Sequence, residues 1–96
     1  MNKNELIGIW RIDQDDKITQ ELYGPIIIEF KDDGILVYTI ISEEKKQVII
    51  MTYEIQGNNI ITDQPSSPKK EMTKFKKLNN KLILEFGGIK SVFIKA

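Results

Sequence analysis

Short hydrophobic runs separated by turn-forming residues are the feature that most restricts the fold of this chain. The turn signals come at near-regular intervals: Asp33-Gly34, Glu43–Lys46, Gly57–Asn59, Asn79-Asn80 and Gly87-Gly88. Asn-Asn and Gly-Gly pairs favour the positive φ angles that two-residue β-hairpins need. The spacing therefore predicts a series of short strands joined mostly by hairpins.

The residues between these turns favour strands over helices. The chain has 18 isoleucines and a single alanine, Ala96. Isoleucine is branched at Cβ and fits a pleated, half-buried surface, whereas alanine is the best helix former. Composition and turn spacing thus predict an all-β protein.

Eight strands account for the whole chain, residues 1–96, as a single domain. We expect them at Leu6–Ile12, Ile26–Phe30, Ile35–Ile41, Val48–Ile55, Ile60–Thr62, Met72–Leu78, Lys81–Phe86 and Ile89–Ile94. Because hairpins join neighbours in the chain, the sheet should be an antiparallel up-and-down meander. Closure into a barrel would remove both sheet edges, so we predict an eight-stranded barrel.

Two connections are too long for hairpins. Asp13–Gly24 contains a candidate helix cap, Asp16, and ends in Gly24-Pro25, which predicts one short helical turn between the first two strands. Gln64–Lys70 contains Pro65 and Pro68, which cannot donate ladder hydrogen bonds, so it should be an exposed loop.

Alternation along the strands predicts which side chains face the barrel interior. The pattern is clear in the second, fourth and seventh strands. Their inward sets are, in that order, Ile26, Ile28 and Phe30; Ile49, Met51, Tyr53 and Ile55; and Leu82, Leu84 and Phe86. The third strand, Ile35–Ile41, is apolar on both faces, and its register stays open. Ile27, Ile50 and part of this strand could then form a partner-binding patch on the outside. Alternatively Asp13–Gly24 covers them, and we favour coverage.

Several function classes are excluded or disfavoured by what the chain lacks. It has no cysteine and no histidine, so thiolate or imidazole metal sites, nucleophilic cysteines and histidine-based triads are ruled out. The loop carboxylates Asp13, Asp15 and Asp16 do not have the EF-hand spacing. Ser66-Ser67 has no histidine to activate it, and Lys69 or Lys70 would need burial to serve as a base. We therefore expect no enzyme activity, no metal site and no cofactor.

Charge and hydropathy bear on partners and location. Fourteen basic and 14 acidic residues balance, which disfavours nucleic acid even though Lys74, Lys76 and Lys77 flank Phe75. No apolar run approaches the 18 or so residues of a membrane-spanning helix. The first five residues lack the apolar core of a signal peptide, so we expect a cytoplasmic location for the chain as given.

The first strand carries the sequence Gly8-Ile9-Trp10, and Phe30-Lys31-Asp32-Asp33-Gly34 enters the third. In these residues the chain resembles small bacterial lipocalin-like domains of the calycin superfamily. The resemblance implies that Trp10 closes one end of the barrel from inside, with a basic side chain of the last strand across its ring. The alternation Ile89, Ser91, Phe93, Lys95 makes Lys95 our candidate for that cation.

The resemblance carries further expectations about the first strand. Gly8 should allow another backbone to approach closely, and Arg11, of opposite parity to Trp10, should point outward. The large secreted lipocalins differ from this chain, because they are longer and usually have Arg where Lys95 stands. The resemblance therefore implies the barrel, and ligand carriage needs its own argument.

Two kinds of function remain. The first is a lipocalin-like binding domain for a small hydrophobic ligand, with Trp10, Tyr38, Met51, Tyr53, Phe75 and Leu84 as the candidate lining residues. The second is a protein-interaction module, such as an immunity protein or protease inhibitor, acting through a loop or a strand face. About 20–25 mostly large inward side chains would fill a barrel this small, so we expect a largely packed interior.

Overall fold

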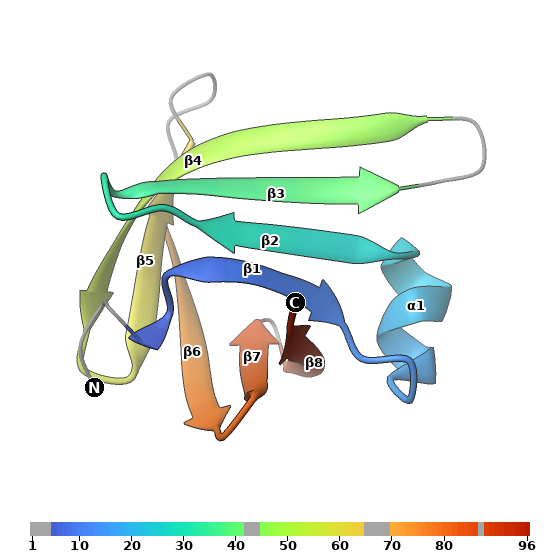
Figure 1. The fold of residues 1–96 in the computed structure, drawn as a ribbon. Helices are drawn as coiled ribbons and strands as arrows, with labels where there is room; N and C mark the ends of the chain where they lie inside the picture. Colours follow the sequence, from blue (N-terminus) through green and yellow to red (C-terminus); the bar gives the residue numbers. More distant parts are fainter. Residues whose placement is uncertain (1–4, 42–44, 65–69, 87) are drawn as a thin grey trace.

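The chain folds into a closed barrel of eight antiparallel strands, as the sequence predicts (Figure 1). The computed structural model describes residues 5–41, 45–64, 70–86 and 88–96. The strands are β1 (Gly8–Ile12), β2 (Ile26–Phe30), β3 (Ile35–Ile41), β4 (Lys46–Gln56), β5 (Asn59–Asp63), β6 (Glu71–Leu78), β7 (Lys81–Phe86) and β8 (Ile89–Lys95). Each pairs with its neighbours in the chain, and β8 pairs with β1 to close the barrel.

The observed strands differ from the predicted ones at their ends. β4 extends two residues earlier and one later than expected, and β6 begins at Glu71 instead of Met72. β1 begins at Gly8 because the chain turns before it, which leaves the predicted strand residue Leu6 outside the ladder but completely buried. Pro65 and Pro68, on which the exposed-loop prediction rested, lie outside the described residues.

The alternation predicted for the inward faces is confirmed for the side chains that the structure describes, and the side chain of Phe86 lies outside them. Buried side chains from all eight strands form one core, whose largest fully buried members include Trp10, Phe30 and Phe93. The structure also settles the register of β3, where Leu36, Tyr38 and Ile40 pack against the core. Since Ile35, Val37, Thr39 and Ile41 alternate with them, these four side chains belong to the outer face.

A single helix, α1 (Lys17–Tyr23), connects β1 to β2 and confirms the predicted helical turn. The Asp16 side chain caps it by accepting hydrogen bonds from the Thr19 amide at 3.1 Å and the Thr19 hydroxyl at 2.8 Å. The same carboxylate accepts a hydrogen bond from the Val92 amide of β8 at 2.9 Å. Asp16 therefore both starts the helix and ties it to the barrel, at the end where β2 begins (Figure 1).

The two roles of Asp16 predict a pH-dependent loss of stability. Burial raises its pKa, but the hydrogen bonds from Val92 and Thr19 outweigh burial and hold the pKa below its ordinary value. The carboxylate thus contributes stability above its unfolded pKa of about 3.9, and that contribution disappears as the pH falls through the lower folded pKa.

We expect Asp16→Ala to lower the free energy of unfolding by about 1–2 kcal/mol at pH 7, and by less at pH 2.5. Urea denaturation at the two pH values measures both losses. Asp15→Ala, which removes an exposed neighbouring carboxylate, should change little at either pH. An equal loss for Asp16→Ala at both pH values would contradict the argument.

Trp10 is completely buried and pairs with Lys95, the last residue of β8, at the end of the barrel here called the closed end; that Trp10 closes this end stays a prediction. Its indole nitrogen donates a hydrogen bond to the Leu6 carbonyl oxygen at 2.9 Å. Lys95 Nζ lies 4.8 Å from the ring centroid, so the predicted stacking of Lys95 on Trp10 is present. Lys95 also donates to the Ile7 carbonyl oxygen. Burial lowers the pKa of Lys95, and the charge of Lys77 lowers it further. The Trp10 ring and the Ile7 carbonyl oxygen therefore hold an ammonium group in surroundings that disfavour its charge.

The expectation for Gly8 needs correction. Its φ angle is +132°, and a Cβ placed there would overlap Lys95 Nζ and lie 2.9 Å from Lys95 Cε. The lysine side chain, and not another backbone, occupies the space that the missing side chain leaves. Arg11 points outward, as predicted.

Among the described residues, no helix has the length and apolar character needed to cross a membrane.

Candidate functional site

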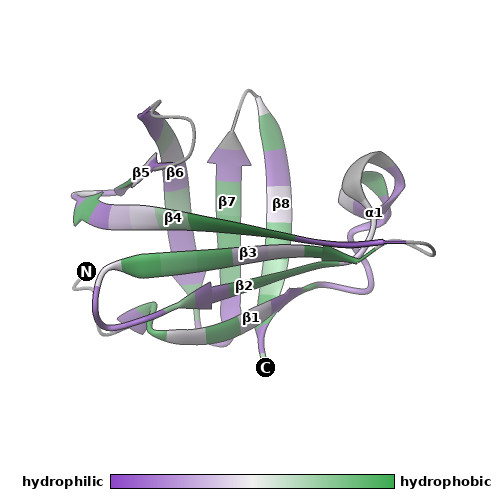
Figure 2. Ribbon diagram, turned by 90° about the horizontal axis from the view of Figure 1, so that it is seen from above, coloured by the Kyte–Doolittle hydropathy of each residue, from purple (hydrophilic) through white to green (hydrophobic). Residues whose placement is uncertain are grey.

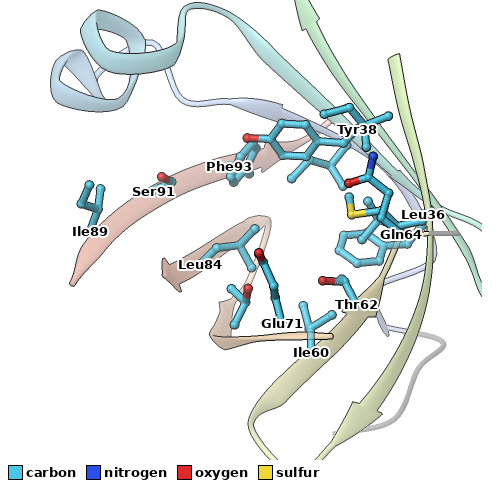
Figure 3. Close-up of a pocket in the computed structure, with 15 residues that line it drawn as sticks. Leu36, Tyr38, Ile60, Thr62, Gln64, Glu71, Leu84, Ile89, Ser91 and Phe93 are labelled. Atoms are coloured by element: carbon cyan, nitrogen blue, oxygen red, sulfur yellow. The ribbon is translucent and has the colours of Figure 1, made fainter. Parts of the chain in front are cut away.

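A pocket of about 340 Å³ opens into the barrel at the end where β6 and β8 begin, and Glu71 and Ile89 are among the residues that line it there (Figure 3). This end, here called the mouth, is where β2, β4, β6 and β8 begin and where α1 lies. The pocket wall is mostly apolar, with Ile28, Phe30, Leu36, Met51 and Phe93 among its residues. A cavity of this size is at the lower end of the range for small-molecule sites in proteins.

The expectation of a largely packed interior stays a prediction. Beside the packed core the barrel has this pocket, and the distribution of side chains explains where the pocket lies. The bulky Trp10, Tyr53 and Phe75 are buried and do not line the pocket. Towards the mouth the inward positions carry smaller or polar side chains instead, such as Thr62, Thr73 and Ser91. The average size of all inward side chains does not show that the small ones lie towards the mouth. Their position there leaves room for the pocket.

The six candidate lining residues divide into two groups. Tyr38, Met51 and Leu84 line the pocket, whereas Trp10, Tyr53 and Phe75 belong to the core outside it. The Tyr53 hydroxyl donates a hydrogen bond to the Lys31 carbonyl oxygen at 2.7 Å, and its ring meets that of Phe30 edge-on at 5.1 Å. Burial, helped by the charges of Asp33 and Asp32, raises the pKa of Tyr53. Tyr53 is thus a structural residue.

Polar side chains gather on the pocket wall towards the mouth. Thr62 and Glu71 face each other across β5 and β6, and both line the pocket together with Gln64, Thr73 and Ser91. Figure 3 shows the Glu71 side chain extending into the cavity. On the β8 side, Thr19 of α1 is completely buried, and its hydroxyl, which donates to Asp16, is hydrogen-bonded to the Ser91 hydroxyl at 3.1 Å. The site therefore combines an apolar interior with a hydroxyl-rich and carboxylate-bearing rim.

Sequence reasoning missed Glu71 for an identifiable reason. The predicted sixth strand began at Met72, so Glu71 fell outside the alternation that would have placed it inward. Thr73 and Phe75 both face the interior. Every second residue of a strand lies on the same face, so Glu71, two residues before Thr73, faces the interior too. In the part of the chain that the structure describes, Asp and Glu side chains do not gather in threes as a metal site would need.

The outer face of β2, β3 and β4 is a second candidate surface. Val37 lies opposite Ile50 and Thr39 opposite Val48 in the ladder, and Ile27 follows on β2. Ile50 is 57% exposed and Val48 49%. The expectation that residues 13–24 cover this face is wrong, because α1 lies next to the ends of β2 and β3 in both views (Figures 1 and 2) and leaves Val48 and Ile50 exposed. Its bonds to Ser91 and Val92 hold it at the mouth.

Comparison with known proteins supports the architecture alone. No family model matches the chain, and none of the curated proteins matches it. A solved structure of an uncharacterized protein from Bacteroides eggerthii DSM 20697 matches with a TM-score of 0.67 at 15% sequence identity. The match covers 95% of this chain and 99% of that one. At such low identity the likeness shows a shared fold, here an eight-stranded antiparallel β-barrel, and function has to be argued from the site.

Proposed function

We propose that this chain is a lipocalin-like domain that binds a small apolar molecule inside the barrel, without a chemical step. The observation that carries the proposal is the pocket of about 340 Å³ with its apolar wall and polar mouth. Few polar groups around a mostly apolar cavity are what small-molecule sites need, because apolar contact supplies affinity and the polar groups orient the ligand. The lipocalin-like assignment is supported by Gly8, Trp10 and Lys95, which lie together at the closed end.

A neutral fluorescent probe tests the proposal directly. N-phenyl-1-naphthylamine should bind wild-type protein with one site per chain, and its emission should rise in the apolar cavity. Thr73 lines the pocket on β6, so Thr73→Trp places a large ring in the cavity on a strand that tolerates aromatic residues. We expect this change to weaken probe binding at least tenfold.

The neighbouring residue provides a matched control. Met72 is on the same strand but on the outer face, and it is 59% exposed. Met72→Trp should leave probe affinity within about twofold of wild type, since the added ring points away from the pocket. Circular dichroism and urea denaturation check that both variants fold. The proposal fails if wild type does not bind the probe, or if Thr73→Trp binds it as tightly as wild type.

A protein-interaction role is the second candidate, supported by the exposed apolar face of Val48 and Ile50. Isolated exposed apolar residues are ordinary, but neighbouring ones on adjacent strands are typical of contact surfaces. Such a module, an immunity protein or inhibitor for example, would use the outer face and leave the cavity without a role. Absence of probe binding to wild type would favour this second function.

A further inference from the structure

The charge inside the pocket indicates what kind of ligand it takes. Among the described residues that line the cavity, Glu71 is the one with a formal charge, and no lysine or arginine is present. Its neighbours on the wall offer hydroxyl and amide groups, which can accept hydrogen bonds as well as donate them. Building on the proposed function, we propose that the ligand is an apolar molecule with a cationic amine, whose ammonium group pairs with Glu71.

Neither the basic residue next to Glu71 nor the described lysines that face the barrel interior neutralise this carboxylate. Lys70 precedes Glu71 but is exposed and lies on the outer surface. Lys77 is six residues further along β6, which corresponds to about 20 Å at a rise of 3.3 Å per residue. Lys95 is at the closed end with Trp10. No ion pair joins Glu71 to a described residue.

The separation of charges along the barrel orients such a ligand. An acid lies near the mouth, and the lysines Lys77 and Lys95 lie towards the closed end, with the apolar cavity between them. An ammonium group is therefore favoured near the mouth, while the hydrocarbon part reaches inward to Phe93 and Ile28. A fatty acid bound in the same way would place its carboxylate against Glu71 and would be repelled.

The hydrogen-bonding capacity of the wall agrees with this assignment. An ammonium group has three donors and no acceptor, so it needs oxygen atoms around it. Glu71 supplies two carboxylate oxygens, and Thr62 lies directly opposite in the β5–β6 ladder. Thr73 follows on the same inward face. A carboxylate ligand would find hydroxyl donors here, but the described residues of the wall offer it no cation.

The experiment compares three probes with the same chain length: dodecylamine, dodecanol and sodium dodecanoate. Each is titrated below its micelle concentration at pH 7 against N-phenyl-1-naphthylamine bound to wild-type protein. Wild type should bind the amine at least tenfold more tightly than the carboxylate, with the alcohol in between. The amine preference should shrink as salt is added, since salt screens a partly exposed charge pair.

The variant Glu71→Gln isolates the charge, because glutamine keeps the shape of the side chain. It should weaken dodecylamine binding about tenfold and leave dodecanol binding within twofold. Glu85→Gln is the matched control, since Glu85 is paired with Lys90 on the outer face and its loss changes net charge equally. Glu85→Gln should leave the affinity for the amine unchanged.

The outcomes separate this inference from the function on which it rests. If none of the three probes displaces the dye and the dye itself does not bind, the carrier function is wrong. If the alcohol binds but the amine has no advantage over the carboxylate, the barrel is a carrier and the amine inference is wrong. An amine preference that persists in Glu71→Gln also overturns the role of Glu71.

Discussion

Replacement of Trp10 by alanine should lower the free energy of unfolding by about 3–5 kcal/mol, the usual cost of deleting a fully buried aromatic side chain. Trp10 is completely buried, pairs with Ile28 and Lys95 in the β1 ladders, and hydrogen-bonds the Leu6 carbonyl oxygen. Its removal leaves a cavity at the closed end and an unpaired carbonyl. Urea denaturation followed by circular dichroism measures the loss.

Two further variants keep this prediction testable. A domain of this size is stabilised by about 5–14 kcal/mol, so Trp10→Ala can remove much of the total. Trp10→Phe retains a ring but loses the hydrogen bond to the Leu6 carbonyl oxygen. It should lower the free energy of unfolding, but by less than Trp10→Ala does. Ile9→Ala, at the adjacent and 45% exposed position, should cost less than about 1 kcal/mol. A loss below 1 kcal/mol for Trp10→Ala would show that Trp10 does not close the barrel.

Replacement of Gly8 by alanine should cost about 2–3 kcal/mol through two separable effects. The φ angle of +132° is one that residues with a Cβ rarely adopt, and holding alanine there costs about 1–3 kcal/mol. The new Cβ would also displace Lys95 from Trp10, which forfeits a cation–π contact worth about 0.5–2 kcal/mol.

A double-mutant cycle separates the two effects of the Gly8 substitution. In a Lys95→Ala background the clash is gone, so Gly8→Ala should cost only the backbone strain, and the two changes should not add. Gly57→Ala is the control for strain alone, because Gly57 has φ +61° and open space around its Cβ position. Strict additivity of Gly8→Ala and Lys95→Ala would show that Gly8 does not make room for the lysine.

Much of the barrel was predictable because its determinants are local. Turn residues such as Asn79-Asn80 set hairpins between neighbouring strands, and alternation placed Met51, Leu82 and Leu84 inward. Asp16 and Gly24 marked the ends of α1 within the connection that contains it. Even the long-range stacking of Lys95 on Trp10 followed from parity together with the family resemblance.

The candidate site was predictable only in part. Tyr38, Met51 and Leu84 were identified as lining residues, but the pocket itself was not expected. Its volume depends on large inward side chains gathering at the closed end, which no single strand reveals. Glu71 was missed because the predicted strand began one residue too late, and where a strand begins depends on its partner strand, here β5.

The sequence by itself determined the strands, the hairpin order and the inward faces of β2, β4 and β7, since turn chemistry and period-two alternation act over a few residues. Tertiary structure decided the register of β3, the position of α1 at the mouth and the open pocket beside Glu71. These three depend on how the closed barrel brings distant strands together. The orientation of β3, which is apolar on both faces, is decided only when all eight strands are paired. The same holds for the position of α1, which is hydrogen-bonded to β8, and for the volume of the pocket.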